Sequence, residues 1–271
     1  MIKIKEDSLR LFLENVRDKY GDDFVNYSYA TLKRRIAIHC IKLNIDTFYL
    51  YTQYVLSSKE IFDEMFSHFS INVTEFFREP EQLKIFKEQV IPYLKTFPYV
   101  KIWCAGCSTG ESPYSLAILL DEANILNKCQ IYATDFNNRV LYHAKKGLYD
   151  IVNFNEISQQ YLESGGVENL QNYFVKKGKF FQIKKRLKEK ILFYNHNLVT
   201  DGSINNFQLV ICKNVVIYFN KDLKDTILKK FDDVIVPNGF LILGDSEFLP
   251  SKFEKKMKLY IKNSKVYQKK C

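Results

Sequence analysis

The sequence has few of the residues that break regular structure or cross-link a chain. Its 271 residues include only 10 glycines, 6 prolines and 6 cysteines. So little glycine and proline leaves no room for a long low-complexity linker, and 46% apolar with 26% charged residues excludes wholesale disorder. Because the opening MIKIKEDSLR is not a secretory signal, we expect free thiols rather than disulfides.

Long apolar runs are absent as well. No run approaches the ~18 residues that a membrane span needs. The sequence therefore predicts a cytoplasmic protein without membrane insertion. At this length we expect one large domain, or a small domain joined to a larger one.

Positive charge is in excess, and it is unevenly placed. The formal net charge is +9, and residues 1–85 are near neutral. The surplus lies in residues 86–271 and is densest in two stretches, Gln171–Lys190 and Ser251–Cys271, each with 8 basic residues and 1 acidic residue. Such a surface favours encounter with an acidic partner. A solvated lysine face, RNA and an acidic protein all remain open as explanations.

The spacing of apolar residues changes along the chain. Up to about residue 94 it predicts helices, including 8–20, 26–42, 48–55, 59–69 and one that starts at Pro80. From Tyr99 onward strands alternate with helices, which predicts a parallel, doubly wound sheet. The segment 149–190 interrupts this alternation, and Lys177-Gly178 within it looks like a hairpin turn. We expect a helical domain with its linker at 1–85, an α/β domain at 86–271 and a small antiparallel insertion at 150–190.

A ligand loop follows the first predicted strand. Gly106 and Gly110 bracket a tight turn, and Asp135 ends the next strand, where its carboxylate could accept hydrogen bonds from ribose hydroxyls. Glu111 stands where a pyrophosphate would otherwise bind the helix N-terminus. A carboxylate there repels phosphate and suits a cation, such as the ammonium or sulfonium of S-adenosylmethionine. The alternative is a glycine-bearing turn in which Asp135 only caps a helix.

Four separated motifs carry a resemblance to a known family, the chemotaxis receptor glutamate O-methyltransferases of the CheR type. The motifs are INVTEFFREPEQ (Ile71–Gln82), WCAGCSTGESPYSLA (Trp103–Ala117), FYNHNL (Phe193–Leu198) and FQLVICKNVVIYF (Phe207–Phe219). The resemblance implies an all-helical N-terminal domain followed by a Rossmann-like class I methyltransferase domain with an inserted β-subdomain. It also implies S-adenosyl-L-methionine as cofactor, S-adenosyl-L-homocysteine as product, and the cytoplasmic helical region of methyl-accepting chemotaxis receptors as partner.

The resemblance also implies roles for individual residues. Catalytic roles fall on Arg78, which would steer the acceptor carboxylate, and on Tyr218, which would pack against the sulfonium or position the acceptor. Ala105 and Glu111 would line the methionine end of the cofactor, Asp135 would hold its ribose, and Asn197 and Leu198 would border its adenine. The remaining cofactor-binding residues that the resemblance implies are Asn72, Thr74, Arg78, Lys213 and Asn214.

The chain departs from the family pattern at two places, and it lacks a loop that only some members of the family carry. Lys213 stands where arginine is usual, which keeps the charge but loses the bidentate fork. Glu-Ser-Pro replaces the common Glu-Glu-Pro, and we expect little effect. No GYG-like insertion occurs near 177–179, so we expect a form that does not depend on a receptor pentapeptide.

The expected chemistry needs no general base, because a glutamate side chain, with a pKa near ~4.3, is already an anion at neutral pH. The site must supply orientation and exclude water. Arg78 could instead form an inter-domain salt bridge, and Tyr218 could be an ordinary strand-end aromatic.

Other readings have less support in the sequence. Cys104 and Cys107 have CxxC spacing, but no further ligands show partner spacing, so we expect no metal site, and a redox pair is less favoured than small residues in a ligand loop. A nucleic-acid methyltransferase would need an Asn/Asp-Pro-Pro-Tyr turn or a Pro-Cys loop, which are absent. We therefore expect no nucleic-acid partner. A non-catalytic scaffold that binds cofactor or receptor remains an alternative.

Overall fold

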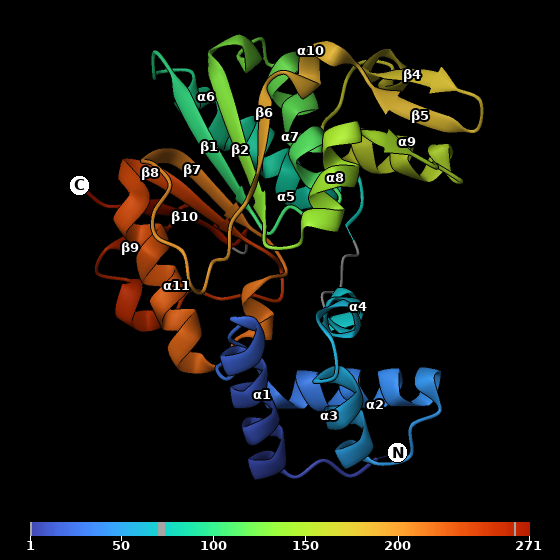
Figure 1. Cartoon of the computed structure of the whole chain (residues 1–271). Helices are drawn as coiled ribbons and strands as arrows, with labels where there is room; N and C mark the ends of the chain where they lie inside the picture. Colours follow the sequence, from blue (N-terminus) through green and yellow to red (C-terminus); the bar gives the residue numbers. More distant parts are fainter. Residues whose placement is uncertain (1, 70–73, 263) are drawn as a thin grey trace. The chain divides into compact units, whose positions relative to one another are not determined.

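The computed structural model describes residues 2–69, 74–262 and 264–271 (Figure 1). Contacts divide the chain into two compact units. The first comprises Met1–Ile71 with Val216–Ile227, and the second comprises Asn72–Val215 with Leu228–Cys271. The boundary between residues 85 and 86 that the sequence suggested for the two domains remains a prediction. Of the helices in the described ranges, none combines the length and apolar composition that crossing a membrane would require.

The first unit is helical, as its apolar spacing predicted. Its helices are α1 (Glu6–Tyr20), α2 (Tyr29–Leu43), α3 (Phe48–Val55) and α4 (Lys59–Phe69). Apolar residues three and four apart on each helix meet in one core that includes Leu9, Phe12 and Ile36. The 3-10 turn Val216–Tyr218 joins this unit through the backbone, because Ser28 N donates to the Tyr218 carbonyl at 2.8 Å.

The second unit is built on a seven-stranded sheet in the order β6-β2-β1-β7-β8-β10-β9. The first five strands in that order are parallel, and β10 runs antiparallel to both β8 and β9. The predicted doubly wound α/β fold, with its parallel central sheet, is therefore confirmed. The strands are β1 (Val100–Ala105), β2 (Cys129–Asp135), β6 (Ile191–Asn195), β7 (Phe207–Cys212), β8 (Ile235–Leu243), β9 (Met257–Leu259) and β10 (Val266–Lys269).

Helices cover both faces of this sheet, and most residues of its central strands are accordingly buried on one face or the other. On one face, Ile102 of β1 shares a core with Leu116 of α7 (Glu111–Glu122) and Leu141 of α8 (Asn138–Lys146). On the other face, the ring of Trp103 meets Phe231 of α11 (Lys221–Val234) at 5.4 Å.

The helix that begins at Pro80 has an irregular middle. α5 (Pro80–Ile85) passes into a π-helical turn (Phe86–Val90) and then α6 (Ile91–Leu94). Pro92 has no N–H for the regular ladder, which fits the wider turn just before it. The helix nevertheless keeps one apolar face, since Phe86, Val90 and Leu94 are all buried.

The insertion is an antiparallel sheet in the order β3-β5-β4, with α9 (Phe154–Glu163) and α10 (Lys185–Lys188) (Figure 1). Its strands are β3 (Leu148–Tyr149), β4 (Phe174–Lys177) and β5 (Phe180–Ile183). Lys177 pairs with Phe180, so the two-residue turn is Gly178–Lys179, one position later than predicted. Gly178 is the first residue of this turn, and it has φ 61°, a value that glycine accepts most readily. Periodicity had not revealed α9.

The turn between β1 and α7 depends on glycine at Gly110. This residue precedes α7 with φ 98°. A Cβ there would lie 2.9 Å from the Ala144 Cβ and 3.0 Å from the Tyr149 hydroxyl. Both the backbone conformation and the close approach of α8 and β3 therefore demand a residue without a side chain.

Replacing Gly110 by alanine should lower the free energy of unfolding by about 2 kcal/mol or more, through backbone strain and the forced shift of two neighbours. The control is Gly178→Ala, which has φ 61° but nothing within 4 Å of the added Cβ, and should cost only about 1 kcal/mol. Urea denaturation measures both changes. Equal losses would contradict the packing argument.

Candidate functional site

Six of the sequence-predicted site residues meet at one edge of the second unit. The neighbouring parallel strands β6, β2, β1 and β7 end at Asn195, Asp135, Ala105 and Cys212. In open α/β sheets ligands bind outside these carboxyl ends. The residues at or just after them are Ala105, Asp135, Asn197, Leu198, Lys213 and Asn214.

Asp135 joins two loops through its carboxylate. Oδ2 accepts from Ser108 N at 2.9 Å and Oδ1 accepts from Asn137 N at 3.0 Å. Burial raises the pKa of Asp135, and the bonds from Asn137 and Ser108 oppose that rise. Each oxygen still has a second acceptor position, which is the chemistry that ribose hydroxyls require.

Glu111 is a carboxyl group whose pKa is raised toward neutral pH. It opens α7, and its Oε2 accepts from the Thr109 hydroxyl at 2.7 Å. The Tyr149 hydroxyl in turn donates to the Thr109 carbonyl at 2.7 Å. Burial raises the pKa of Glu111 to about 7. A cation brought next to this group would favour the carboxylate form, so the position suits the charged methionine end of the expected cofactor.

The loop after β6 carries Asn197 and Leu198 and is tied down by two groups. Asn197 N donates to the Asp201 carboxylate at 2.9 Å. The Lys230 ammonium donates to the carbonyls of Leu198 at 2.9 Å and Asp201 at 2.9 Å. Leu198 is thereby kept buried at the strand end, where an apolar side chain can contact a flat base.

The turn after β7 is held by a buried carboxylate, Glu247. Its Oε2 accepts from Asn214 N at 2.9 Å and from Gly244 N at 2.8 Å, and its Oε1 accepts from Val215 N at 2.9 Å. Asn214 itself has φ 60°, a conformation that asparagine tolerates. One side chain therefore joins the ends of β7 and β8.

Arg78 lies in a strained segment that is bound to the same edge. The residues on either side, Phe77 and Glu79, both have positive φ, 55° and 56°. Phe77 N donates to the Ser115 hydroxyl at 2.9 Å. The Lys213 ammonium lies 2.9 Å from the Glu79 carboxylate and donates to the Arg78 carbonyl at 3.1 Å. Strain of this kind concentrates at functional sites.

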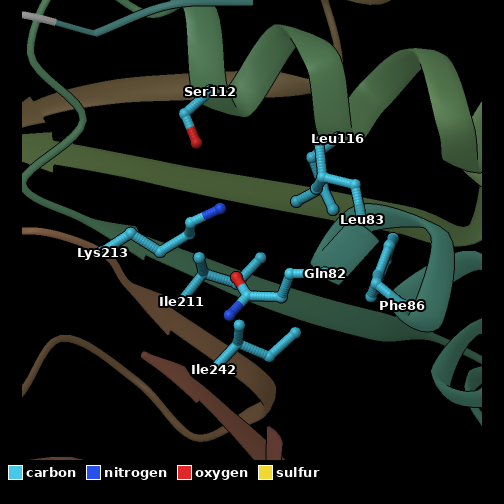
Figure 2. A pocket seen from close by; sticks show the side chains of 8 residues that line it. All are labelled: Gln82, Leu83, Phe86, Ser112, Leu116, Ile211, Lys213 and Ile242. Atoms are coloured by element: carbon cyan, nitrogen blue, oxygen red, sulfur yellow. The ribbon is translucent and has the colours of Figure 1, made fainter. Parts of the chain in front are cut away.

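A small pocket lies beside this segment, between α5, α7 and strands β7 and β8 (Figure 2). The Ser112 hydroxyl and the Lys213 ammonium point into it, and apolar side chains make up most of its wall. Burial lowers the pKa of Lys213, while the Glu79 carboxylate opposes that change. The pocket therefore places polar groups at the strand ends next to Arg78.

The other predicted residues are placed as follows. Asn72 lies outside the described residues. Thr74 is partly buried in the second unit, and Tyr218 lies in the first unit. The cysteines of the CxxC sequence are free thiols, and burial raises the pKa of Cys104 to about 12, so the structure gives no support to a reactive redox pair.

Three residues at the edge were not singled out from the sequence: Glu79, Glu247 and Lys230. Glu79 lies inside the motif Ile71–Gln82, but nothing in the sequence pointed to an ion pair there. Glu247 and Lys230 act on backbone groups more than 30 residues away, and no local pattern marks them.

Glu111→Gln is expected to have opposite effects on stability and cofactor affinity. The raised pKa means that wild-type stability is lost as pH rises from about 4.5 through about 7, whereas glutamine does not titrate. The variant should therefore gain about 1–3 kcal/mol over wild type at about pH 8 but not at about pH 5, and should bind S-adenosyl-L-methionine about tenfold more weakly at pH 8. Thermal unfolding and calorimetry measure these effects.

The matched control is Glu163→Gln, an exposed glutamate on α9. It should change neither quantity. A Glu111→Gln protein that loses the same stability at both pH values would show that burial does not raise the pKa of this carboxyl group.

Comparison with known proteins identifies the family. Residues 72–266 match the family described as CheR methyltransferase, SAM binding domain, and residues 7–70 match CheR methyltransferase, all-alpha domain. The Cher3 protein of Pseudomonas putida is 36% identical over 262 residues, which cover 96% of each chain. The chemotaxis protein methyltransferases of Listeria innocua and Listeria monocytogenes are 32% and 31% identical over 249 residues, which cover 91% of this chain and 92% of theirs. The chain belongs to the CheR methyltransferase family, and S-adenosyl-L-methionine is its methyl donor.

Proposed function

We propose that the protein transfers the methyl group of S-adenosyl-L-methionine to glutamate side chains of bacterial chemoreceptors. The observation that carries this proposal is the division of charge at the strand ends. The partly buried carboxyl group of Glu111 and the buried one of Asp135 lie on the side of β1 and β2, whereas Arg78 lies on a segment fixed beside the turn after β7. One side suits a cationic donor and the other an anionic acceptor.

The reaction suits a site of this kind because it joins two opposite charges. The acceptor carboxylate attacks the sulfonium methyl carbon, the carbon–sulfur bond breaks, and a methyl ester and a neutral thioether remain. No proton has to move, so no general base is required. What the residues must supply is alignment, and a charge-assisted bond from Arg78 would supply it for the acceptor.

The names of the relatives support the proposed acceptor class. Two of them, from Listeria species, are named chemotaxis protein methyltransferases. We therefore infer that the acceptor is the cytoplasmic helical region of a chemoreceptor, and that the protein acts in the cytoplasm. Only a two-residue turn joins β4 and β5, and the absence of a longer loop there supports recognition without a receptor pentapeptide.

The β4–β5 hairpin offers a surface for an acidic acceptor protein. Lys176 and Lys177 are exposed on β4. Arg186, in the same basic stretch, pairs with Asp121 and lies 5.5 Å from the Tyr173 ring centre, so it serves the fold. The two lysines of β4 are therefore the better probes of docking.

Replacing Arg78 by alanine should reduce methyl transfer to chemoreceptor-rich membranes by at least about a hundredfold, since the acceptor carboxylate loses its charged partner. Calorimetry should show that S-adenosyl-L-homocysteine affinity changes by less than about threefold. The measurement uses tritiated S-adenosyl-L-methionine, and base-labile methanol release identifies a carboxyl ester.

Transfer of label to RNA instead of receptors would contradict the proposed acceptor. Cofactor binding without any transfer would favour a scaffold. Near-normal turnover of the Arg78→Ala protein would remove Arg78 from its role, and the Arg78→Lys protein shows whether charge alone suffices.

Replacing Lys176 and Lys177 together by glutamate should weaken receptor association about tenfold at low salt and less at high salt, because exposed charges act over roughly a Debye length. The control, Lys255→Glu with Lys258→Glu, makes the same change in net charge on other exposed residues. Sedimentation with receptor membranes measures both. Equal effects of the two pairs would show that net charge, and not docking on the hairpin, governs receptor association.

A further inference from the structure

Aromatic rings of the insertion hold the two residues that lead into Arg78. The buried ring of Phe76 meets Tyr149 of β3 at 4.9 Å and Phe174 of β4 at 5.6 Å. The buried ring of Phe77 meets Tyr161 of α9 at 5.1 Å. The strained backbone before Arg78 is therefore packed against three elements of the insertion.

Tyr149 also reaches the cofactor loop. Its hydroxyl donates to the Thr109 carbonyl at 2.7 Å, and the Thr109 hydroxyl donates to Glu111 Oε2 at 2.7 Å. The same hydroxyl lies 3.0 Å from the Cβ position of Gly110, so this turn is closed tightly over the tyrosine. One side chain thus contacts both the Thr109–Glu111 turn and Phe76, two residues before Arg78.

The insertion is itself anchored at the far end of α7. Glu122 accepts from the hydroxyls of Tyr161 and Tyr173 and pairs with Lys87 at 2.6 Å. Its side chain is only 1% exposed, so these contacts are shielded from water. The insertion is therefore fixed near both ends of α7, and Tyr149 meets the end that bears Glu111.

We propose that Tyr149 is a positioning residue through which the inserted subdomain sets both sides of the methyl-transfer site, Glu111 through Thr109 and Arg78 through Phe76. An acceptor protein that docks on the insertion would thereby act on the groups that face the donor and the acceptor. The acceptor half of this inference rests on the proposed function, whereas the Glu111 half concerns cofactor binding alone.

The test is the pH dependence of S-adenosyl-L-homocysteine binding, measured by calorimetry between about pH 6 and about pH 8. The bond from Thr109 lowers the pKa of Glu111, so releasing Thr109 should raise it further. In Tyr149→Phe, binding should be at least about threefold weaker than wild type near pH 6.5 and should approach wild type near pH 8. The other titratable groups coupled to Glu111 are Tyr149, Tyr114 and Cys107, and burial raises the pKa of each, so they stay neutral in this range.

Matched variants separate positioning from stability. Thr109→Val should reproduce the change, and Thr109→Ser, which keeps the hydroxyl, should restore the wild-type profile. Tyr161→Phe removes another buried hydroxyl of the insertion, so it should lower the melting temperature and leave the profile unmoved. If Tyr149→Phe does not fold, Thr109→Val tests the step from the Thr109 hydroxyl to Glu111, and an unmoved profile there still overturns the Glu111 half.

A wild-type profile in Tyr149→Phe and Thr109→Val would overturn the proposal. For the Arg78 side, Tyr149→Leu should lower kcat for receptor methylation more than Tyr149→Phe does, because only leucine removes the ring beside Phe76. Equal kcat values would overturn that half. If wild type methylates no receptor but the binding profiles still shift, the proposed function fails and the positioning role of Tyr149 toward Glu111 stands.

Discussion

The site depends on two carboxyl groups that the fold withdraws from water at the open ends of β1 and β2. Burial disfavours the charge of Glu111 and Asp135, and only a few groups oppose that effect: backbone N–H groups at Asp135, and the Thr109 hydroxyl and the start of α7 at Glu111. Burial therefore raises the pKa of both groups, and a cationic ligand beside them would favour their charged forms. Affinity for such a ligand is obtained at the expense of folding stability.

The same logic applies to the backbone that carries Arg78. The two non-glycine residues with positive φ on either side of Arg78, Phe77 and Glu79, cost about 1–3 kcal/mol each and persist only because the surroundings hold them. Here the surroundings are a serine on α7, the ion pair between Lys213 and Glu79, and the rings of the insertion. These contacts come from elements far apart in the chain. The backbone that carries Arg78 is thus fixed by contacts within the protein itself, before any substrate binds.

The sequence allowed the local features of this arrangement to be predicted, and long-range contacts explain much of the rest. Alternating apolar runs gave the parallel strands, and Gly106, Gly110 and Asp135 gave the ligand loop, because each rests on neighbours in the chain. The helix α9 was not predicted, although Asn153 caps its start and Phe154, Ile157 and Tyr161 follow one another at three- and four-residue spacing. Glu247 and Tyr149 were missed for a different reason, because each acts on backbone groups that only folding brings near. Residue roles taken from the resemblance, such as Tyr218, stay predictions.

Lys213 shows how a departure from the family pattern can be accommodated. The concern with lysine was the loss of a planar fork that grips a carboxylate with two bonds. In this structure the ammonium has two separate acceptors on adjacent residues, the Glu79 carboxylate and the Arg78 carbonyl. A compact charge can satisfy both without a fork. Since these contacts hold the Arg78 segment, the demand at this position is for a buried cation, and lysine meets it as long as Glu79 opposes the effect of burial on its pKa.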